Sequence, residues 1–327
     1  MNGKQQTMLF LSKDGSLHEG TIFMPRSMGY GANLIRVTPE ELRNDAGLFL
    51  KSLQKEAELL HPDVIVLNYD PTYLAEMSGC HVQMTSPYVW QIVSHSLDGR
   101  EAEWADFSIT NLADSGRLSL YRDVLTMMKK LSQTPVFSLV PTPLTLCRQL
   151  TGDSFLQKLA EKDSQWEELM DAALYVISDT LKVYLEGGSE GILFYEDLSG
   201  FETAQLNLPS NLIDFYRTLY NILKHYQKRA IFWMCGTPPE GANVYRHETV
   251  IGTIAGIDSC IDFKETDEQL AQKIASDLNQ VKRSQSFVYS PLILPQAQPE
   301  KVLALVQQVH SRKNEQVGSE LVAAANS

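Results

Sequence analysis

Short apolar runs alternate with amphipathic stretches along nearly the whole chain. Continuous apolar runs bounded by turn residues are typical of strands that are buried on both faces of a sheet. Apolar residues that recur every three or four positions are typical of helices with one buried face. The apolar runs predict strands at Thr21–Arg26, Asp63–Asn68, Val136–Val140, Gly191–Tyr195, Ala230–Cys235, Val250–Ala255, Asp258–Phe263 and Ser286–Ser290.

The amphipathic stretches between these runs predict helices, and the clearest of them carry signals at their ends. Thr38 suits the N-cap and Pro39 the first position of one helix over Thr38–Leu60. A longer helix begins near Trp166 and ends at Gly187–Gly188, since glycine commonly terminates helices. The other expected helices are a short one after Pro71, Leu118–Leu131, one after Pro143, Pro209–Gln227, Asp267–Asn279 and Pro299–His310.

Repeated strand–helix units predict a parallel sheet with right-handed crossovers. We expect an α/β fold, a single (β/α)8 TIM barrel, with an open doubly wound sheet as the alternative. Eight strands are reached only if Val250–Ala255 is one of them. We expect the barrel at residues 21–312, an N-terminal extension at 1–20 and a flexible tail at 313–327. Met84–Ile109 shows no clear period and is expected to run over the surface.

Length, charge and cysteine content narrow the class of protein. A chain of 327 residues with 43% hydrophobic residues is ordinary for a single barrel with a large core. The net charge of −12 argues against a nucleic-acid or membrane binder, but leaves room for a local basic pocket. No secretory signal or membrane-spanning run is visible, so we expect a soluble, cytoplasmic protein. Its four widely spaced cysteines are expected to be reduced.

Polar residues follow the ends of the predicted strands. In barrels, reactive groups lie just after the carboxyl ends of the strands, so these residues are candidates for a site. Each of them could instead cap the helix that follows. Taken together, they would bring two arginines and three carboxylates to one mouth. The residues are Arg26, Asp70, Thr142, Arg148, Glu196, Asp197, Cys235, Tyr289 and Ser290.

Several segments resemble the uroporphyrinogen decarboxylase superfamily, over roughly residues 20–310. The run VPTPLTLCRQLTG at Val140–Gly152 is similar to its phrase G-P-F/L-T-L-A-x-x-L-x-G. FMPRSMGYGANL resembles M-R-Q-A-G-R-Y, with Arg26 on the first arginine and Tyr30 on the second. DVIVLNYDPTYLAEMSGC resembles D-x-x-x-x-A-E-A-x-G-C, and Asp70 falls on the aspartate that decarboxylases use to bind pyrrole N–H groups. The superfamily includes the decarboxylase of haem synthesis and zinc-dependent methyltransferases that handle methylated corrinoids.

The chain departs from the methyltransferase pattern at the zinc ligands. Those enzymes bind zinc through His-x-Cys and a distant cysteine near the last strand, because a zinc-bound thiolate is a strong nucleophile toward methyl groups. Here Trp233 stands where the histidine belongs, Cys235 matches, and Ser290 lies near the expected second cysteine. One ligand of three cannot hold zinc, so we expect no metal and regard Cys235 as a remnant. His225 or His247 could substitute only through a different geometry.

The decarboxylase pattern is also incomplete, because Gln149 replaces a tyrosine, Asp197 replaces a serine and a late glycine–histidine pair is missing. The stretch after Cys235 is short for the family, consistent with one reduced β/α unit near the C-terminus. The resemblance still implies a metal-free decarboxylase of a carboxylated tetrapyrrole or related cyclic anion, with catalytic residues Asp70 and Arg26. No cofactor is needed, because a protonated pyrrole accepts the electrons. Substrate binding is assigned to Tyr30, Arg148, Gln149, Asp197 and Tyr289.

Two alternatives remain open. One is a corrinoid-linked methyltransferase with an altered or lost zinc site, and the other is a non-catalytic barrel that binds a tetrapyrrole or corrinoid. In each case the partner is an anionic small molecule and not nucleic acid or a membrane. A homodimer is an open option for the assembly.

Overall fold

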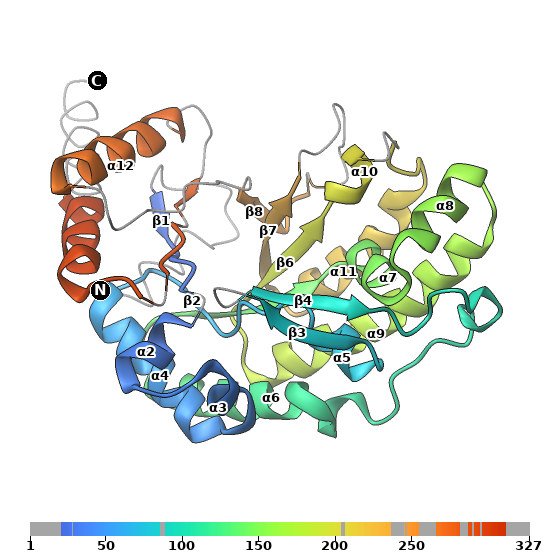
Figure 1. The fold of residues 1–327 in the computed structure, drawn as a ribbon, viewed down its shortest axis with the longest axis horizontal. Coiled ribbons are helices and arrows are strands. Elements are labelled where there is room, and N and C mark those ends of the chain that lie inside the picture. The colour runs from blue at the N-terminus through green and yellow to red at the C-terminus, as the bar shows by residue number, and fades with distance from the viewer. Residues whose placement is uncertain are drawn as a thin grey trace.

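The protein forms an α/β fold with parallel strands surrounded by helices (Figure 1). The computed structural model describes residues 21–27, 29–85, 89–203, 207–236, 245, 247–254, 266–281, 287–289, 291–294 and 296–311. The strands are β1 (Thr21–Phe23), β2 (Ile65–Val66), β3 (His81–Thr85), β4 (Val89–Ser94), β5 (Val136–Pro141), β6 (Gly191–Asp197), β7 (Arg229–Cys235), β8 (Val250–Ile254) and β9 (Phe287–Tyr289).

The helices cover the outside of the strands. They are α2 (Tyr30–Ile35), α3 (Pro39–Asn44), α4 (Ala46–Leu60), α5 (Tyr73–Met77), α6 (Gly116–Leu131), α7 (Pro143–Thr151), α8 (Asp153–Glu161), α9 (Gln165–Gly187), α10 (Ser199–Thr203), α11 (Leu212–His225), α12 (Asp267–Val281) and a closing helix at 299–311. Single turns of 3-10 helix lie at Glu101–Glu103 and Leu112–Asp114. No helix of the described residues has the length and apolar character needed to cross a membrane.

The parallel strands follow one another in the order of a barrel. A five-stranded sheet runs in the order β2-β5-β6-β7-β8, and β1 pairs in parallel with β9. The two sheets meet on one side where the Asp63 N–H, just before β2, donates to Phe23 O of β1 at 2.9 Å. On the other side β8 contacts β9. The first strand therefore lies beside the last, which agrees with a TIM barrel and not with an open doubly wound sheet.

Alternate residues of the strands belong to two different hydrophobic cores, one inside the barrel and one between the strands and the helices, because successive side chains of a strand point to opposite faces. On β6, Leu193 and Tyr195 belong to the cluster inside the barrel, whereas Ile192 and Phe194 pack outward under the helices. The inner cluster also contains Ile22, Met24, Val64, Val66, Phe137, Leu139, Ile231, Trp233 and Ile254. This two-residue period decides which side chains at the strand ends reach the barrel interior.

A separate cluster joins the beginning and the end of the chain. Phe23 of β1, Tyr30 of α2 and Leu60 of α4 pack against the closing helix through Val302 and Leu305. Figure 1 shows α12 and the closing helix on the same side of the molecule as β1 and α2. The N- and C-terminal parts of the fold therefore share one hydrophobic core.

Two expectations on local structure are wrong. The single helix expected over Thr38–Leu60 is divided, because Asp45 adopts an extended conformation between α3 and α4 and its side chain caps α4 at Leu48 N. The expected Thr38 capping box is present, but it starts the short helix α3. Part of Met84–Ile109 is regular, since β3 and β4 form an antiparallel hairpin.

The other expected strands and helices are present with shifted ends, and β2 is the most shortened of them. The expected strand at Asp258–Phe263 lies outside the described residues. The division into an extension, a barrel and a tail stays a prediction, because residues 1–20 and 312–327 also lie outside them.

The pairing of β5 with β6 generates a first testable prediction. Gly191 pairs with Phe137, and an added Cβ at Gly191 would overlap the Phe137 ring. We expect Gly191→Ala to lower the free energy of unfolding by about 1–3 kcal/mol through overpacking. Urea denaturation measures it, with Gly47→Ala on the exposed face of α4 as the control, where nearly full stability is expected. Equal stability of the two variants would contradict the close packing of β5 on β6.

Candidate active site

A buried arginine lies at the mouth of the barrel interior. The Arg26 residue is 7% exposed and is fixed by its backbone, which exchanges hydrogen bonds with Pro291 O at 2.9 Å and Ile293 N at 2.8 Å. Its guanidinium carbon lies 5.4 Å from the centre of the Trp233 ring, a cation–π contact. Trp233 in turn packs edge-on against Tyr195 at 4.8 Å and Tyr69 at 6.2 Å. Arg26 is thus a desolvated cation that lies over the ring of Trp233, which Tyr195 and Tyr69 hold from the side.

Three of the predicted residues meet at the ends of β6 and β7. Asp197 is in register with Cys235, and Arg148 of α7 donates to Asp197 O at 2.9 Å and forms an ion pair with its carboxylate at 3.2 Å. The pKa of the Cys235 thiol is raised from its ordinary value of 9.0, first by burial and then by the charge of Asp197. Cys235 is therefore a thiol at neutral pH and a weak nucleophile.

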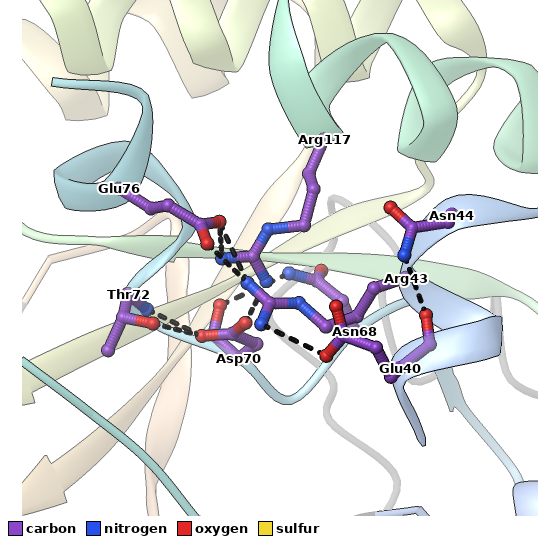
Figure 2. A network of polar contacts seen from close by, with 8 residues as sticks. All are labelled: Glu40, Arg43, Asn44, Asn68, Asp70, Thr72, Glu76 and Arg117. Atoms are coloured by element: carbon purple, nitrogen blue, oxygen red, sulfur yellow. Dashed lines mark hydrogen bonds and ion pairs between the residues drawn. The ribbon is translucent and has the colours of Figure 1, made fainter. Parts of the chain in front are cut away.

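Asp70 is held away from this group, toward α5 and α6. One carboxylate oxygen accepts from Thr72 N at 2.8 Å and Thr72 Oγ1 at 2.6 Å, and the other accepts from the guanidinium of Arg117 (Figure 2). Each side chain of the Asp70–Arg117 ion pair is only 8% exposed. Asp70 therefore stabilises the turn before α5, as the capping alternative expected, and is also part of a buried ion pair.

The ion pair belongs to a chain of alternating charges that the sequence analysis did not identify. Arg117 of α6 also contacts Glu76 of α5, and Arg43 Nη2 of α3 donates to both Glu76 oxygens at 2.8 Å (Figure 2). The Arg43 guanidinium lies 3.5 Å from the centre of the Trp90 ring on the β3–β4 hairpin. These residues lie on helices and a hairpin, so a search at strand ends could not find them. Glu76 was visible only as part of a family motif.

A small pocket adjoins this network. Its volume is about 90 Å³, and its walls include Arg43, Phe49, Tyr69, Asp70, Trp90 and Tyr121. Tyr69 also faces Trp233 and donates its hydroxyl to Pro25 O at 2.5 Å. Tyr69 is therefore the common wall between this pocket and the Arg26 group.

The structure does not bring all predicted residues to the mouth. Tyr30 is fully buried in the cluster that joins the two ends of the fold, and burial together with Glu56 raises its pKa to about 12. Gln149 Nε2 donates to Pro71 O at 3.2 Å, behind Asp70. Tyr289 lies on β9, but its side chain is outside the described part of the chain. The substrate-binding roles of these residues stay predictions.

The two histidines named as substitute ligands point elsewhere. The His247 ring stacks on Tyr220 at 4.4 Å, and His225 packs edge-on against Tyr226 at 5.1 Å. Within the described ranges, no three His, Cys, Asp or Glu side chains gather as metal ligands. Ser290 lies outside those ranges.

Glu196 is a fully buried carboxyl on the outward side of β6. One oxygen accepts from Thr142 Oγ1 at 2.6 Å and Thr145 Oγ1 at 3.1 Å, and the other accepts from the hydroxyls of Tyr216 and, at 3.3 Å, Tyr245. Burial raises the pKa of Glu196 to about 7, and these hydrogen bonds only partly oppose the rise. Thr145 Oγ1 also accepts from Asp197 N at 2.9 Å, so the Glu196 cluster supports the strand end that carries Asp197.

Comparisons with known proteins agree with this fold. A family model described as uroporphyrinogen decarboxylase (URO-D) matches residues 24–275. Among the solved structures that match, a methyltransferase from Methanosarcina mazei has a TM-score of 0.73 and 15% sequence identity, over 95% of this chain and 99% of that chain. At this identity the likeness shows the fold alone. No curated protein matches the chain.

The buried Glu196 carboxyl generates a prediction on pH and stability. Its pKa is about 7 in the folded chain against an ordinary 4.5, so the folded state holds the proton more tightly. Its stabilising contribution is complete below pH 4.5 and is lost as the pH rises through about 7. As the pH rises from 5 to 8, we expect the unfolding free energy of wild type to fall by roughly 2 kcal/mol more than that of Glu196→Gln.

Urea denaturation at both pH values measures this difference, with Glu168→Gln on the exposed face of α9 as the control. Glu56 is also fully buried with a pKa of about 7, so part of the pH dependence remains in the variant. An identical pH dependence of wild type and Glu196→Gln would show that Glu196 does not titrate in this range.

Cys235 generates a prediction on thiol reactivity. Because burial and Asp197 raise the pKa of its thiol above 9.0, we expect slow alkylation by iodoacetamide at pH 7 and a midpoint above pH 9. Peptide mass spectrometry separates Cys235 from the other cysteines. Asp197→Asn should lower the midpoint, whereas the surface variant Asp179→Asn should not. A wild-type midpoint near pH 7 would contradict this assignment and favour a nucleophilic thiolate.

Proposed function

Because the chain belongs to the uroporphyrinogen decarboxylase family, we propose that it is a carboxy-lyase that acts without a metal on a carboxylated tetrapyrrole or a related cyclic anion. The position of Arg26 carries the proposal. A buried guanidinium binds a carboxylate through two parallel charge-assisted hydrogen bonds, and the exclusion of water strengthens them. Arg26 is buried and its guanidinium lies over the Trp233 ring, which supports the role of holding a substrate carboxylate.

The proposed chemistry needs no cofactor. Loss of CO2 from a pyrrole acetate leaves the electron pair of the broken C–C bond on the carbon attached to the ring. The ring therefore first takes up a proton from solvent, and its positive charge needs stabilisation. When the C–C bond breaks, CO2 leaves and the ring accepts the electron pair. The exocyclic carbon then gains a proton and the ring loses one, so that the acetate becomes a methyl group. We assign the stabilisation of the ring's positive charge to the Asp70 carboxylate. Thr72 and Arg117 occupy three of its roughly four acceptor positions, which leaves one for a pyrrole N–H.

The residues at the ends of β6 and β7 supply the remaining polar surface of the proposed site. Arg148 is paired with Asp197, so the pair offers donors and acceptors without a large net charge. We assign Arg148 and Asp197 to substrate orientation. Family membership supports an enzyme-like role, whereas the substrate and the reaction belong to the proposal.

The methyltransferase alternative is less well supported. Of the zinc ligands of the family's methyltransferases the chain retains Cys235, and burial and Asp197 raise the pKa of that thiol, which disfavours the thiolate form that binds a metal. The position of the family's zinc-binding histidine is filled by Trp233, whose indole packs against Tyr195 and Tyr69, so a methyl transfer here would have to proceed without that ligand. The likeness to the methyltransferase from Methanosarcina mazei concerns the fold alone, so it favours neither decarboxylation nor methyl transfer.

Binding of a porphyrin tetracarboxylate tests the proposed function. We expect wild type to bind it, and Arg26→Ala to bind it about 10- to 100-fold more weakly, because a desolvated charged hydrogen bond is lost. Fluorescence titration of the porphyrin measures the affinity. Arg217→Ala, on the exposed face of α11, is the matched control and should bind like wild type.

Absence of binding to wild type, or equal binding by Arg26→Ala, would contradict the tetrapyrrole proposal and favour the corrinoid or non-catalytic alternatives. Asp70→Asn is a less clean test of catalysis, because it also breaks the buried pair with Arg117. Removing one partner of such a pair typically costs about 3–5 kcal/mol of stability.

A further inference from the structure

We propose that Glu56 of α4 is a positioning residue for Arg26 and acts through the chain segment that joins β1 to α2. This inference rests on the proposed function and extends it, since it names the residue that holds the carboxylate-binding arginine in place. Glu56 lies in the middle of a helix, so a search at strand ends could not find it. Its role follows from its contacts with the neighbours of Arg26 in the chain.

Both carboxylate oxygens of Glu56 accept hydrogen bonds from the segment that follows Arg26. One oxygen accepts from the hydroxyl of Ser27, and the other accepts from Gly31 N at 2.5 Å. Gly31 N belongs to the first turn of α2, where the N-cap residue Gly29 provides no side-chain hydrogen bond. A negative charge at the first turn of a helix is favourable, so Glu56 takes the place of a capping residue from the neighbouring helix.

The contact at Gly31 leaves no room for a larger side chain. A Cβ added to Gly31 would lie 2.5 Å from Glu56 Oε1 and 2.9 Å from Ser52 O, and both atoms belong to α4. Both distances are shorter than normal contacts of a Cβ atom. The start of α2 therefore lies directly against α4, and Glu56 is at the point of contact.

Arg26 and Ser27 point to opposite sides of the barrel wall. Met24 belongs to the inner cluster, whereas Phe23 packs outward against the closing helix. The same alternation sends Arg26 inward, over an aromatic ring of the inner cluster, and sends Ser27 outward to Glu56. Glu56 therefore holds the chain neighbour of Arg26 and does not compete with an anionic substrate for the guanidinium.

Tyr69 holds the same segment on the other side of Arg26. Its hydroxyl donates to Pro25 O at 2.5 Å, so Arg26 lies between one fixed residue before it and another, Ser27, after it. The pKa of Tyr69 is raised well above 10.0, first by burial and then by the charge of Glu56, while Arg26 lowers it. The cavity beside Ser27, Glu56 and Tyr69 has a volume of about 20 Å³, which is room for about one water molecule and for no substrate.

Glutamine is a close substitute for Glu56, and alanine is not. Burial raises the pKa of Glu56 to about 7, and the hydrogen bonds from Ser27 and Gly31 only partly oppose the rise, so part of the protein carries the neutral acid at neutral pH. In Glu56→Gln the amide oxygen can accept from Gly31 N, and the amide N–H can donate to Ser27 Oγ. Glu56→Ala removes both contacts.

The reactivity of Arg26 toward phenylglyoxal tests the inference without a ligand. Arg26 is 7% exposed, so we expect slow modification in wild type and in Glu56→Gln. In Glu56→Ala we expect modification at least about fivefold faster, because the segment opens more often. Peptide mass spectrometry separates Arg26 from the exposed Arg217, whose rate should be the same in all variants. Glu58→Ala, on the exposed face of α4, and Gly191→Ala, which is destabilised elsewhere, are the controls and should modify Arg26 like wild type.

A double-mutant cycle on porphyrin affinity tests whether Glu56 acts through Arg26. We expect Glu56→Ala to weaken binding of a porphyrin tetracarboxylate at least about fivefold, and Glu56→Gln to bind within about twofold of wild type. In the Arg26→Ala background we expect Glu56→Ala to change the affinity by less than about twofold. A residue with only a structural role would weaken binding equally in both backgrounds. If Glu56→Ala fails to fold, Ser27→Ala removes one of the two contacts and replaces it in both measurements, with the same directions expected.

The outcomes separate this inference from the proposed function. Equal modification of Arg26 in wild type and Glu56→Ala, an equal loss of affinity in the two backgrounds, or a loss in Glu56→Gln as large as in Glu56→Ala overturns the inference. If porphyrin binding then still depends on Arg26, the proposed function stands without it. If Arg26 is modified faster in Glu56→Ala but wild type does not bind the porphyrin, Glu56 still positions Arg26 and the tetrapyrrole proposal fails.

Discussion

The two-residue period of the strands is the constraint on which the rest of the structure depends. On β6 and β7 it sends Tyr195, Asp197, Trp233 and Cys235 toward the barrel interior and Glu196 toward the helices. The period is interrupted after β2, which ends at Val66. Val64 and Val66 face the interior, yet it is Tyr69 that continues the inner cluster. Asp70 then pairs with Arg117 of α6 and lines the pocket beside Tyr69.

Outward-facing acids must be satisfied within the helix layer, and the fold does this in two ways. Asp70 forms an ion pair with the guanidinium of Arg117. Glu196 is surrounded by neutral hydroxyls, whose hydrogen bonds only partly oppose the effect of burial, so its pKa is about 7. A buried carboxylate without a cation is costly, and protonation relieves that cost. The fold therefore contains one buried acid stabilised by a neighbouring charge and another stabilised by binding a proton.

The sequence predicts most of the fold but only part of the candidate site. Apolar runs such as Val136–Val140 and end signals such as Thr38 and Gly188 depend on local preferences, and the structure agrees with them. The break at Asp45 and the β3–β4 hairpin depend on tertiary packing, which no local pattern shows. The Arg43–Glu76–Arg117 chain depends on how three helices are rotated about their axes. The strand-end rule identified Arg26, but alternation counted from Val66 would have turned Asp70 inward.

The shared core of β1 and the closing helix has a consequence for the order in which the molecule assembles. During synthesis β1 is made well before its partner β9 and the helix at 299–311. Contacts between residues so far apart in sequence are slow to form, because a long loop must close first. Phe23 of β1 therefore reaches its final packing only after the helix at 299–311 has been made.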